Sequence, residues 1–480
     1  MPAPIFGPGD FTGARVLVAG ARVTGASAAR MLTELGAEVT VTDSSPTQLQ
    51  ALAGAPWVDG SWGAGGPVRL AAGLDMPPPG TDLVVTSPGF RPDAPLMVAA
   101  HRSGVPVIGD VTLARWIDGV RAGARSGPGQ APAQWLVVTG TNGKTTTVGM
   151  LAAMLRAAGM DAVACGNIGL PVLDAVRMGH RVLAVELSSF QLHWSRELNP
   201  RAAVVLNVAA DHLDWHGSLS EYAAAKGSVY GEGTTAVVNV DDEWSTRLAA
   251  GRGGVGFTIG EPGEGQLGVV GQQLVDRAFG GSESTEVLAL LTDVRPAGRH
   301  NVANALAAAA LARCLGVAAP AVAEGLRAFT PGAHRGVPVG EHAGVRYLDD
   351  SKATNPHAAR AALLAWRRVV WVAGGLLKGV EVDELVIDTR DRLAGAVLLG
   401  ADRAVIAAAL ARHAPDVPVR VVDSGDHDAM SEVVAAAAEL AEPGGVVLLA
   451  PAAASMDMFR DYTHRGRAFA AAVAALGGAG

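Results

Sequence analysis

The residues with the clearest chemical meaning lie in the run Val137–Thr147, which reads Val-Val-Thr-Gly-Thr-Asn-Gly-Lys-Thr-Thr-Thr. An apolar strand leads into a glycine-bearing loop, and a helix is expected to start near Thr146. Backbone N–H groups and the helix N-terminus then bind phosphate, and Lys144 adds a full positive charge. The Thr145 hydroxyl is placed to bind Mg²⁺. Val138 stands where the usual pattern has glycine, and a plain glycine-rich turn is the alternative.

Acidic side chains follow two apolar runs that are predicted to be buried strands. Glu186 follows the run 181–185, and Asp211-His212 follows the run 202–207. A carboxylate at the end of a core strand is costly unless it is paired or bound to a metal. Glu186 is therefore a predicted Mg²⁺ ligand, and His212 a second one. A histidine satisfied within its own loop is the alternative for His212.

Two asparagines and a lysine are harder to interpret. Asn167 lies in a tight loop that could present its amide to a phosphate. Asn301 precedes an Ala-rich helix and is a good N-cap, which leaves Asn304, one turn later, unexplained. Lys226 lies in a predicted helix over residues 219–230, and the residue types alone predict a solvated side chain there.

The first hundred residues have the layout of a dinucleotide-binding opening. The apolar run 16–20 ends in glycine, a helix follows, and a second strand ends in Asp43. Arg22 replaces the second glycine of the usual pattern, which disfavours a nicotinamide cofactor. A nucleotide diphosphate held by the backbone of Val23 and by Thr24 fits as well.

Two further residues lie at strand ends of this first part. Asp43 would hold a ribose or base edge, or would only cap its strand. Ser87 follows the strand 83–86, where open α/β sheets bind ligands, although Ser-Pro-Gly also suits a simple turn.

Bulk properties limit the classes of function. The 480 residues suggest about three domains. The net charge, 38 − 46 = −8, argues against a general nucleic-acid binder. Cys165 and Cys314 have no paired spacing, so neither a disulfide framework nor a zinc site is expected, and a reducing cytosol fits. We expect no secretory signal and no membrane span.

Apolar runs ending in glycine recur three times and alternate with Ala/Leu-rich helices, which indicates an α/β protein with three parallel-sheet units. We expect a Rossmann-like N-terminal domain (1–109), a central P-loop ATPase domain (110–331) and a Rossmann-like C-terminal domain (332–480). Residues 119–134 are predicted to be a linker or loop. The glycine-rich stretch 251–286 holds either a small antiparallel sheet or loops.

Motifs in all three units resemble those of the Mur ligases, above all the members that add D-glutamate. They are Thr139–Thr146, Glu186–Leu192, Asp211–Asp214, Arg299–Asn301 with Asn304, His334-Arg335, Asp350–Asn355 and Ala450–Ser455. The resemblance runs from about residue 15 to 470 in the same order. The folylpolyglutamate synthases share the loop variant and the asparagine pair, whereas Asp350–Asn355 and Ser188–Leu192 are more specific to the D-glutamate enzymes.

The resemblance implies an ATP-dependent amide ligase that joins D-glutamate to UDP-N-acetylmuramoyl-L-alanine through an acyl phosphate, in cytoplasmic peptidoglycan precursor synthesis. It implies ATP and Mg²⁺, with two Mg²⁺ sites, and small-molecule substrates as the partners of a monomer. A hinge near Thr330–Ala333 would close on ATP.

The resemblance also implies roles for individual residues. ATP would contact Gly140, Thr141, Asn142, Gly143, Lys144, Thr145, Thr146, Asn301, Asn304, Arg335, Asp350 and Lys352. The UDP-sugar would contact Val23, Thr24, Asp43, Ser87, Asn167 and His212. D-Glutamate would contact His334, Thr354, Lys378, Ser455 and Tyr462. Mg²⁺ would be bound by Thr145, Glu186, His212 and Lys226, the last as a carbamate, and the catalytic set would be Lys144, Glu186, His212, Lys226 and Lys352.

Two departures and three alternatives accompany this interpretation. The segment Gly374–Gly379 lacks the acidic residue that the family often has there, and Tyr462 stands where phenylalanine is common. Another amide ligase of the same type with a different acceptor is one alternative. A nucleotide-gated binding protein is the second, and a nicotinamide dehydrogenase with its cofactor at Gly20–Gly25 is the third.

Overall fold

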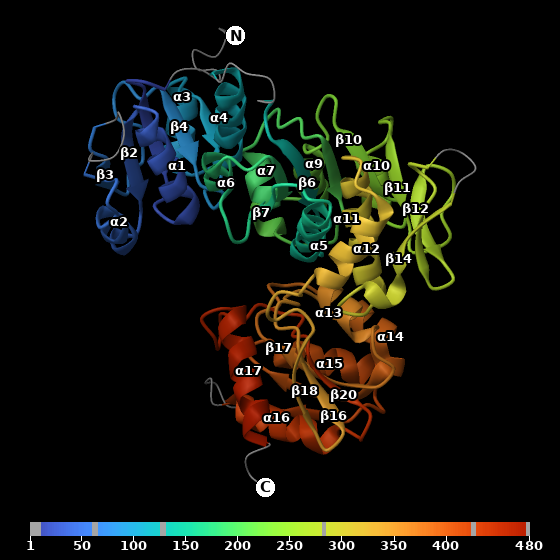
Figure 1. Ribbon diagram of the computed structural model, residues 1–480. Coiled ribbons are helices and arrows are strands. Elements are labelled where there is room, and N and C mark those ends of the chain that lie inside the picture. Colours follow the sequence, from blue (N-terminus) through green and yellow to red (C-terminus); the bar gives the residue numbers. More distant parts are fainter. Residues whose placement is uncertain (1–10, 60–65, 125–130, 281–284, 424–428, 477–480) are drawn as a thin grey trace. The chain divides into compact units, whose positions relative to one another are not determined.

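The computed structural model describes residues 11–59, 66–124, 131–280, 285–423 and 429–476, shown in Figure 1. Contacts within the chain define two compact units. The first contains residues 1–290 and 304–328, and the second contains 291–303 and 329–480. Strands in the described ranges form three sheets, which confirms the predicted α/β class. The boundaries 1–109, 110–331 and 332–480 stay predictions.

The first sheet has the strand order β3-β2-β1-β4-β5, and all its pairs are parallel. Its strands are β1 (Arg15–Ala19), β2 (Glu38–Asp43), β3 (Arg69–Ala72), β4 (Leu83–Thr86) and β5 (Val107–Gly109). The connecting helices are α1 (Val23–Glu34), α2 (Pro46–Ala53) and α3 (Pro95–Arg102). The order reverses at β1 and β4, so their carboxyl ends form the switch point where such sheets bind ligands.

Helix α4 (Asp110–Ala124) follows β5 directly. The prediction of a loop over residues 119–134 is therefore wrong for 119–124, while 125–130 lie outside the described residues. Arg121 explains part of the difference, because its guanidinium donates to the carbonyl oxygens of Val176 at 3.1 Å and Arg177 at 3.3 Å. These contacts tie the last turns of α4 to the helix Val172–Met178, which the local composition does not reveal.

The central sheet has the order β14-β13-β12-β11-β10-β9-β6-β8-β7. Its strands are β6 (Gln134–Thr139), β7 (Ala162–Gly166), β8 (Val182–Glu186), β9 (Ala202–Val205), β10 (Thr235–Asn239), β11 (Gly254–Phe257), β12 (Gln266–Val270), β13 (Gln273–Asp276) and β14 (Glu286–Leu290). Strands β12, β13 and β14 pair antiparallel, so the glycine-rich stretch contributes an antiparallel extension rather than loops alone.

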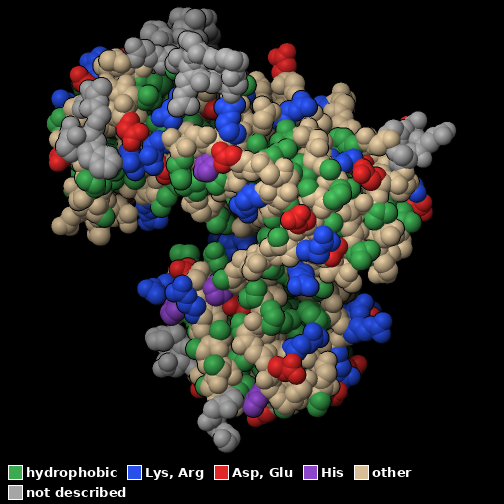
Figure 2. All heavy atoms as spheres, viewed as in Figure 1, with side chains coloured by type: hydrophobic (Ala, Val, Ile, Leu, Met, Phe, Trp, Pro, Cys, Tyr) green, Lys and Arg blue, Asp and Glu red, His purple; other side chains and the backbone are tan. Residues whose placement is uncertain are grey.

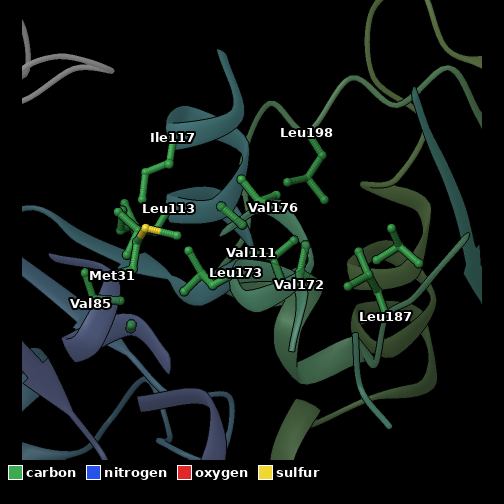
Figure 3. Packing of buried hydrophobic residues seen from close by; sticks show 14 of the residues in the cluster. Met31, Val85, Val111, Leu113, Ile117, Val172, Leu173, Val176, Leu187 and Leu198 are labelled. Atoms are coloured by element: carbon green, nitrogen blue, oxygen red, sulfur yellow. The ribbon is translucent and has the colours of Figure 1, made fainter. Parts of the chain in front are cut away.

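The helices of this part are α5 (Lys144–Ala157), α6 (Val172–Met178), α7 (Ser189–His193), α8 (Leu213–His216), α9 (Leu219–Gly227), α10 (Glu243–Leu248), α11 (Arg299–Arg313) and α12 (Ala319–Ala328). Figure 3 shows how α4 packs against both neighbours. Val111 and Leu113 of α4 lie in one buried cluster with Met31 of α1 and with Val172 and Val176 of α6. Because this core is continuous, the first two sheets belong to one compact unit.

The second unit has a sheet in the order β15-β16-β20-β17-β18-β19, parallel except for β15 with β16. Its strands are β15 (Val337–His342), β16 (Val345–Asp349), β17 (Val369–Gly374), β18 (Leu393–Leu399), β19 (Val419–Val421) and β20 (Val446–Leu449). Its helices are α13 (Pro356–Leu363), α14 (Asp383–Thr389), α15 (Arg403–His413), α16 (Ala429–Leu440) and α17 (Tyr462–Leu476). Buried clusters lie on both faces, as expected for a doubly wound sheet.

The face of the molecule in Figure 2 carries Lys and Arg interspersed with Asp and Glu, in keeping with the moderate net charge of −8. Among the described helices, none is both long and apolar enough to cross a membrane.

Candidate active site

The phosphate-binding loop leaves the central sheet between two neighbouring strands. Strand β6 pairs with β9 on one side and β8 on the other, and Val138 lies in register with Glu186. Helix α5 begins at Lys144, two residues earlier than predicted, after Gly143 with φ of 87°. That left-handed conformation favours glycine, and it lets the helix start directly at the lysine.

Glu186 contacts two other predicted site residues. Its side chain is buried, and Oε2 accepts a hydrogen bond from the Thr145 hydroxyl at 2.7 Å. Oε1 accepts from the amide nitrogen of Asn167 at 3.0 Å. The carboxylate therefore lies beside the hydroxyl that is predicted to bind Mg²⁺. One hydrogen bond to each of its oxygens fixes the orientation of the carboxylate.

Lys226 is buried, so the prediction of a solvated side chain is wrong. Only 1% of it is exposed, and Nζ donates to the carbonyl oxygen of Gly140 at 2.9 Å. Nζ also lies 4.3 Å from the centroid of the Tyr222 ring. The composition of α9 gives no sign of this, because the burial arises from α7 and from the phosphate-binding loop, which are distant in the chain.

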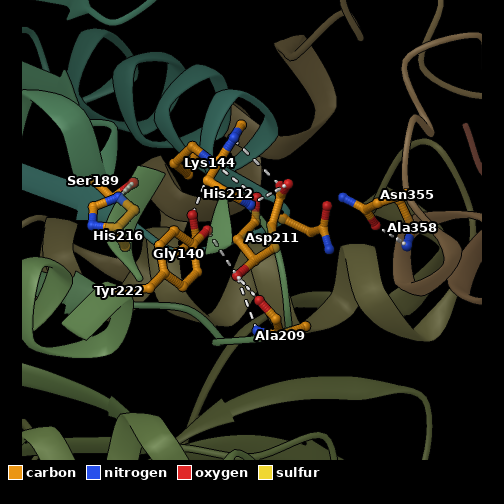
Figure 4. Close-up of polar contacts among 12 residues, drawn as sticks. Gly140, Lys144, Ser189, Ala209, Asp211, His212, His216, Tyr222, Asn355 and Ala358 are labelled. Atoms are coloured by element: carbon orange, nitrogen blue, oxygen red, sulfur yellow. Dashed lines mark hydrogen bonds and ion pairs between the residues drawn. The ribbon is translucent and has the colours of Figure 1, made fainter. Parts of the chain in front are cut away.

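The same carbonyl accepts from a second lysine, as Figure 4 shows for Lys144 and Gly140. Lys144 Nζ donates to the carbonyl oxygen of Gly140 at 2.8 Å and to that of Thr141 at 2.9 Å. Burial lowers the pKa of Lys226 well below its ordinary value, and the charge of Lys144 lowers it further, while Asp211 opposes both effects. The Lys226 side chain is thus biased towards a neutral amine.

His212 lies at the start of α8 with φ of 53°, an unusual backbone conformation for a residue with a side chain. Its Nε2 lies 3.5 Å from Oδ2 of Asp211, and its ring centroid lies 4.7 Å from that of Phe190.

His216, which the sequence did not indicate, shares a hydrogen bond of 2.9 Å between its Nε2 and the Ser189 hydroxyl. Burial lowers the pKa of His216 to about 4, so this ring is neutral at pH 7.

Asn304 lies against the phosphate-binding loop. A Cβ added to Gly143 would lie 2.3 Å from Oδ1 of Asn304, so only glycine leaves room for this amide. Asn301 is buried one turn earlier, but α11 begins at Arg299, so its prediction as the N-cap is wrong. The helix starts after Gly298 with φ of 135°, which is where the chain turns.

At the switch point of the first sheet, Thr24 and Ser87 come together. The Thr24 hydroxyl donates to Ser87 Oγ at 3.4 Å, and a Cβ at Gly20 would lie 2.3 Å from the same Ser87 oxygen. Asp43 accepts from the backbone N–H groups of Ala21 and Ser45, at 2.8 Å each, which is the capping role left open for it. Val23 begins α1 and is exposed.

In the second unit, His334 and Asp349 form a buried pair with Nδ1 2.5 Å from Oδ2. Nζ of Lys352 lies 4.0 Å from the centroid of the Tyr462 ring, and that ring is 6.3 Å from the ring of His334. His334, Lys352 and Tyr462 are thus brought together at the carboxyl end of β16. Nearby, burial raises the pKa of Asp350 to about 7, against the effect of Arg335.

Arg465 ties together the segments that carry the predicted D-glutamate residues. Its guanidinium donates to Ser351 Oγ at 3.0 Å, to the Ser351 carbonyl at 2.9 Å, to Ala453 at 3.1 Å and to Gly374 at 3.3 Å. The predicted contacts Thr354, Lys378 and Ser455 lie on these three segments. Lys378 is exposed with φ of 56°, in the loop that lacks the family's usual acidic residue.

Comparisons with known proteins identify the family. The Mur ligase middle domain family matches residues 138–312, and the family described as Mur ligase, glutamate ligase domain matches residues 334–453. The UDP-N-acetylmuramoylalanine–D-glutamate ligase of Streptomyces coelicolor is 52% identical, over 98% of this chain and 100% of its own length. The proteins of that name from Thermobifida fusca and Mycobacterium avium are 53% and 50% identical, with at least 96% of this chain covered.

The chain belongs to the Mur ligase family, among the UDP-N-acetylmuramoylalanine–D-glutamate ligases. Two solved Mur ligases share its fold at low identity. The UDP-N-acetylmuramate–alanine ligase MurC of Thermotoga maritima has a TM-score of 0.57 at 19% identity, covering 96% of this chain and 99% of its own. MurF of Acinetobacter baumannii has a TM-score of 0.55 at 20% identity, covering 82% and 85%.

The opening of this Mur ligase also resembles a dehydrogenase. Residues 6–56 match the C-terminal domain of alanine dehydrogenase/PNT. That match covers the β1-α1-β2 unit, which the two kinds of protein share as a fold element. Residues 138–312 and 334–453 match Mur ligase families instead, which disfavours the dehydrogenase alternative.

The donor groups of this Mur ligase fit Mg²⁺. Glu186 and Thr145 supply oxygens next to a phosphate-binding loop, and His212 supplies a nitrogen. In the described ranges no three His, Cys, Asp or Glu side chains are grouped closely enough to hold a metal. A metal here would need further oxygens from substrate phosphates or from a modified Lys226.

Sequence reasoning missed several residues of this site. Tyr222 packs against Lys226 and has its hydroxyl 3.2 Å from Thr141 Oγ1, and its place four residues before the lysine was the available signal. Asp349 could have been noted as the last residue of a buried strand. Arg465 lies in a helix of ordinary composition, and no local signal marks it.

Proposed function

We propose that the chain joins D-glutamate to UDP-N-acetylmuramoyl-L-alanine in an ATP-dependent reaction of peptidoglycan precursor synthesis. The observation that carries this proposal is the identity of about one half, over nearly the full length, to ligases named for that reaction. The arrangement of Lys144, Thr145 and Glu186 around a phosphate-binding loop supports the ATP-dependent step.

The reaction proceeds in two steps that conserve atoms and charge. The substrate carboxylate attacks the γ-phosphorus of ATP, which gives an acyl phosphate and ADP. The neutral amine of D-glutamate then attacks the acyl carbon, the nitrogen–carbon bond forms as the carbon–oxygen bond to phosphate breaks, and the proton lost by the amine leaves with inorganic phosphate. The protein contributes placement and neutralisation of charge rather than a covalent link to the substrate.

Residues of the central domain bind the triphosphate. The loop from Gly140 to Thr146 would hold the phosphates through its N–H groups, and Lys144 would compensate their charge. Asn301 and Asn304 would hold adenine. Mg²⁺, bound by Thr145, Glu186 and His212 at one or both of two sites, would stabilise the charge that develops during phosphoryl transfer.

Lys226 would serve as a carbamate. A neutral Nζ adds to CO₂, a nitrogen–carbon bond forms as one carbon–oxygen π bond opens, and a proton is released, which converts the neutral amine into a carbamate anion. The lowered pKa of Lys226 favours the reactive amine, and the positive charge of Lys144 favours the anion that results. The new oxygens would bind Mg²⁺, and the repulsion between two lysines would become an attraction.

The remaining predicted contacts divide between the other two substrates. Val23, Thr24, Asp43, Ser87, Asn167 and His212 would hold the UDP-sugar acid. His334, Thr354, Lys378, Ser455 and Tyr462 would hold D-glutamate, while Arg335, Asp350 and Lys352 would contact ATP. We place the enzyme in the cytoplasm, as a monomer.

The test is ADP release with ATP, Mg²⁺, UDP-N-acetylmuramoyl-L-alanine and a panel of amino acids. The proposal expects release that depends on both the sugar nucleotide and D-glutamate, with L-glutamate inactive. Turnover with a different amino acid would establish another acceptor. ADP release without any acceptor, or none at all, would favour a nucleotide-gated binding protein.

A further inference from the structure

The second step of the proposed reaction needs a base, and no residue has yet been assigned to it. An α-ammonium group is largely protonated at pH 7, whereas only the neutral amine of D-glutamate attacks an acyl phosphate. Histidine is the side chain whose ordinary ionisation suits this proton transfer. In the second unit, Nδ1 of the buried His334 lies 2.5 Å from Oδ2 of the buried Asp349.

The fold fixes both members of this pair. Asp349 is the last residue of β16, only 1% of it is exposed, and its Oδ1 accepts from the N–H of Ser351 at 2.9 Å. The backbone of His334 has φ of 62°, and its carbonyl oxygen accepts from the N–H of Lys352 at 3.2 Å. A left-handed φ is unfavourable for a residue with a side chain, so the surrounding contacts must hold this conformation.

Helix α17 packs against the pair at Gly466. A Cβ added at Gly466 would lie 2.1 Å from Nδ1 of His334 and 2.6 Å from Oδ2 of Asp349. Any side chain at this position would therefore push the two groups apart. Because the helix backbone lies directly against them, the hydrogen bond between them is shielded from water and is strengthened by the low local dielectric.

The pair leaves one ring nitrogen of His334 available. A carboxylate only accepts hydrogen bonds, so the shared hydrogen belongs to Nδ1 and the lone pair of the ring to Nε2. Among the described residues, Nε2 has no hydrogen-bond partner, and it is open to solvent. The ring of Tyr462, a proposed contact of D-glutamate, has its centroid 6.3 Å from that of His334. Nε2 is thus an acceptor close to the proposed amino-acid site.

The charges around His334 make the carboxylate of Asp349 necessary for this role. The other titratable groups that neighbouring elements bring near the pair are Arg335, Asp350, Lys352, Asp457, Tyr462 and Arg465. The cations among them disfavour a second proton on the ring, whereas a carboxylate in direct contact favours it. Asp349 therefore allows Nε2 to accept a proton and to hold it.

We propose that His334 removes a proton from the ammonium group of D-glutamate, and that Asp349 is the positioning residue that makes Nε2 the acceptor. One N–H bond of the ammonium breaks, and its electron pair stays on nitrogen as the lone pair that attacks the acyl carbon. The hydrogen bonds covalently to Nε2, and the imidazolium later releases it to water. The inference rests on the proposed function, because it takes D-glutamate as the attacking substrate.

The first experiment measures kcat/KM for D-glutamate between about pH 6 and pH 9. In the wild type this value should become constant once the ring is neutral, because the ammonium form is the one that binds. An amide at position 349 cannot accept from both Nδ1 and the Ser351 N–H. Asp349→Asn should therefore be at least tenfold slower at pH 7, and its rate should rise steadily with pH as free amine becomes available. Gly466→Ala keeps both groups but separates them, and it should show the same rise.

Asp383→Asn is the matched control for the loss of a carboxylate. Asp383 forms a partly exposed pair with His413 in the same unit, with Oδ1 2.6 Å from Nε2. This variant should keep the pH profile of the wild type. A structural role of Asp349 alone would lower kcat/KM by the same factor at every pH, so the slope of the profile separates the two explanations.

The second experiment replaces D-glutamate with hydroxylamine, whose nitrogen is neutral at pH 7 and which traps the acyl phosphate as a hydroxamate. Asp349→Asn should form hydroxamate with a loss at least tenfold smaller than its loss with D-glutamate, which also shows that the variant is folded. Equal losses with the two nucleophiles, or wild-type pH profiles in both the Asp349 and Gly466 variants, would overturn the inference. Absence of hydroxamate with the wild type would contradict the proposed function itself, and the inference with it.

Discussion

The ammonium groups of Lys144 and Lys226 donate to one acceptor, the carbonyl oxygen of Gly140, at 2.8 and 2.9 Å. Two cations on a single carbonyl repel each other, and the more buried of them, Lys226, has its pKa lowered well below the ordinary range. Such a pair is unfavourable unless one member changes its charge. This relationship is the strongest structural reason to expect a carbamate at Lys226.

Replacing Lys226 tests this reasoning. Lys226→Ala should lower the rate of ADP release about a hundredfold or more, because a carboxylate near the metal is lost. Millimolar acetate should restore part of the activity by supplying a carboxylate in the vacated space. Lys144→Ala is the matched control, since it should also abolish ADP release but should gain nothing from acetate. If acetate helps neither variant, the carbamate is excluded as the source of the effect.

Glu186→Gln tests the metal role of the strand-end acid. The variant keeps the shape of the side chain but loses the negative charge and one acceptor, so the Mg²⁺ concentration for half-maximal activity should rise about tenfold or more. Glu232→Gln, a change of the same kind at an exposed position, should leave the Mg²⁺ requirement as it is. A normal Mg²⁺ requirement in the Glu186 variant would contradict the assignment.

The free energy of unfolding should depend on pH because Asp110 titrates within the measured range. Its pKa is raised to about 7 in the folded protein from an ordinary value of 3.8, so between these values the folded state binds more protons than the unfolded state. The stabilising contribution is complete below pH 3.8 and is lost as the pH rises through about 7. Asp110→Asn should therefore raise the melting temperature more at pH 8 than at pH 5. An equal difference at both pH values would refute the titration.

Arg465→Met tests the arginine that joins three segments of the second unit. The change leaves the carbonyl oxygens of Ser351, Gly374 and Ala453 without their donor, which should cost about 3 kcal/mol of unfolding free energy. The KM for D-glutamate should rise because the loops lose their relative positions. Urea denaturation and initial-rate kinetics measure the two effects. Arg467→Met, an exposed change two residues on, should alter neither quantity.

The sequence was sufficient for features that depend on neighbouring residues. The order of strand, glycine loop, lysine and helix predicted the phosphate-binding loop, and the structure has β6, the loop and α5 in that order. Glu186 was recognisable because a carboxylate ends an otherwise apolar run. The start of α11 was misplaced because the chain turns at Gly298, three residues before Asn301, whose polar side chain had suggested the N-cap.

Features that depend on contacts between distant segments of the chain could not be predicted from the sequence. The composition of residues 119–134 suggested a loop, yet 119–124 belong to α4, and Arg121 contacts α6 there. Nothing near Arg465 in the chain indicates that its partners lie 91 and 114 residues away. Such contacts exist only once separate strands have paired and their carboxyl ends have met.

The amino-acid sequence by itself indicated the family, the α/β class and the candidate phosphate-binding and acidic side chains, because these follow from local motifs, from local backbone geometry and from residue type. Only the tertiary structure decided that Lys226 and Asp110 are buried and in which direction their pKa values shift. Desolvation and charge repulsion depend on which groups surround a side chain in space, and here those groups come from segments distant in the chain.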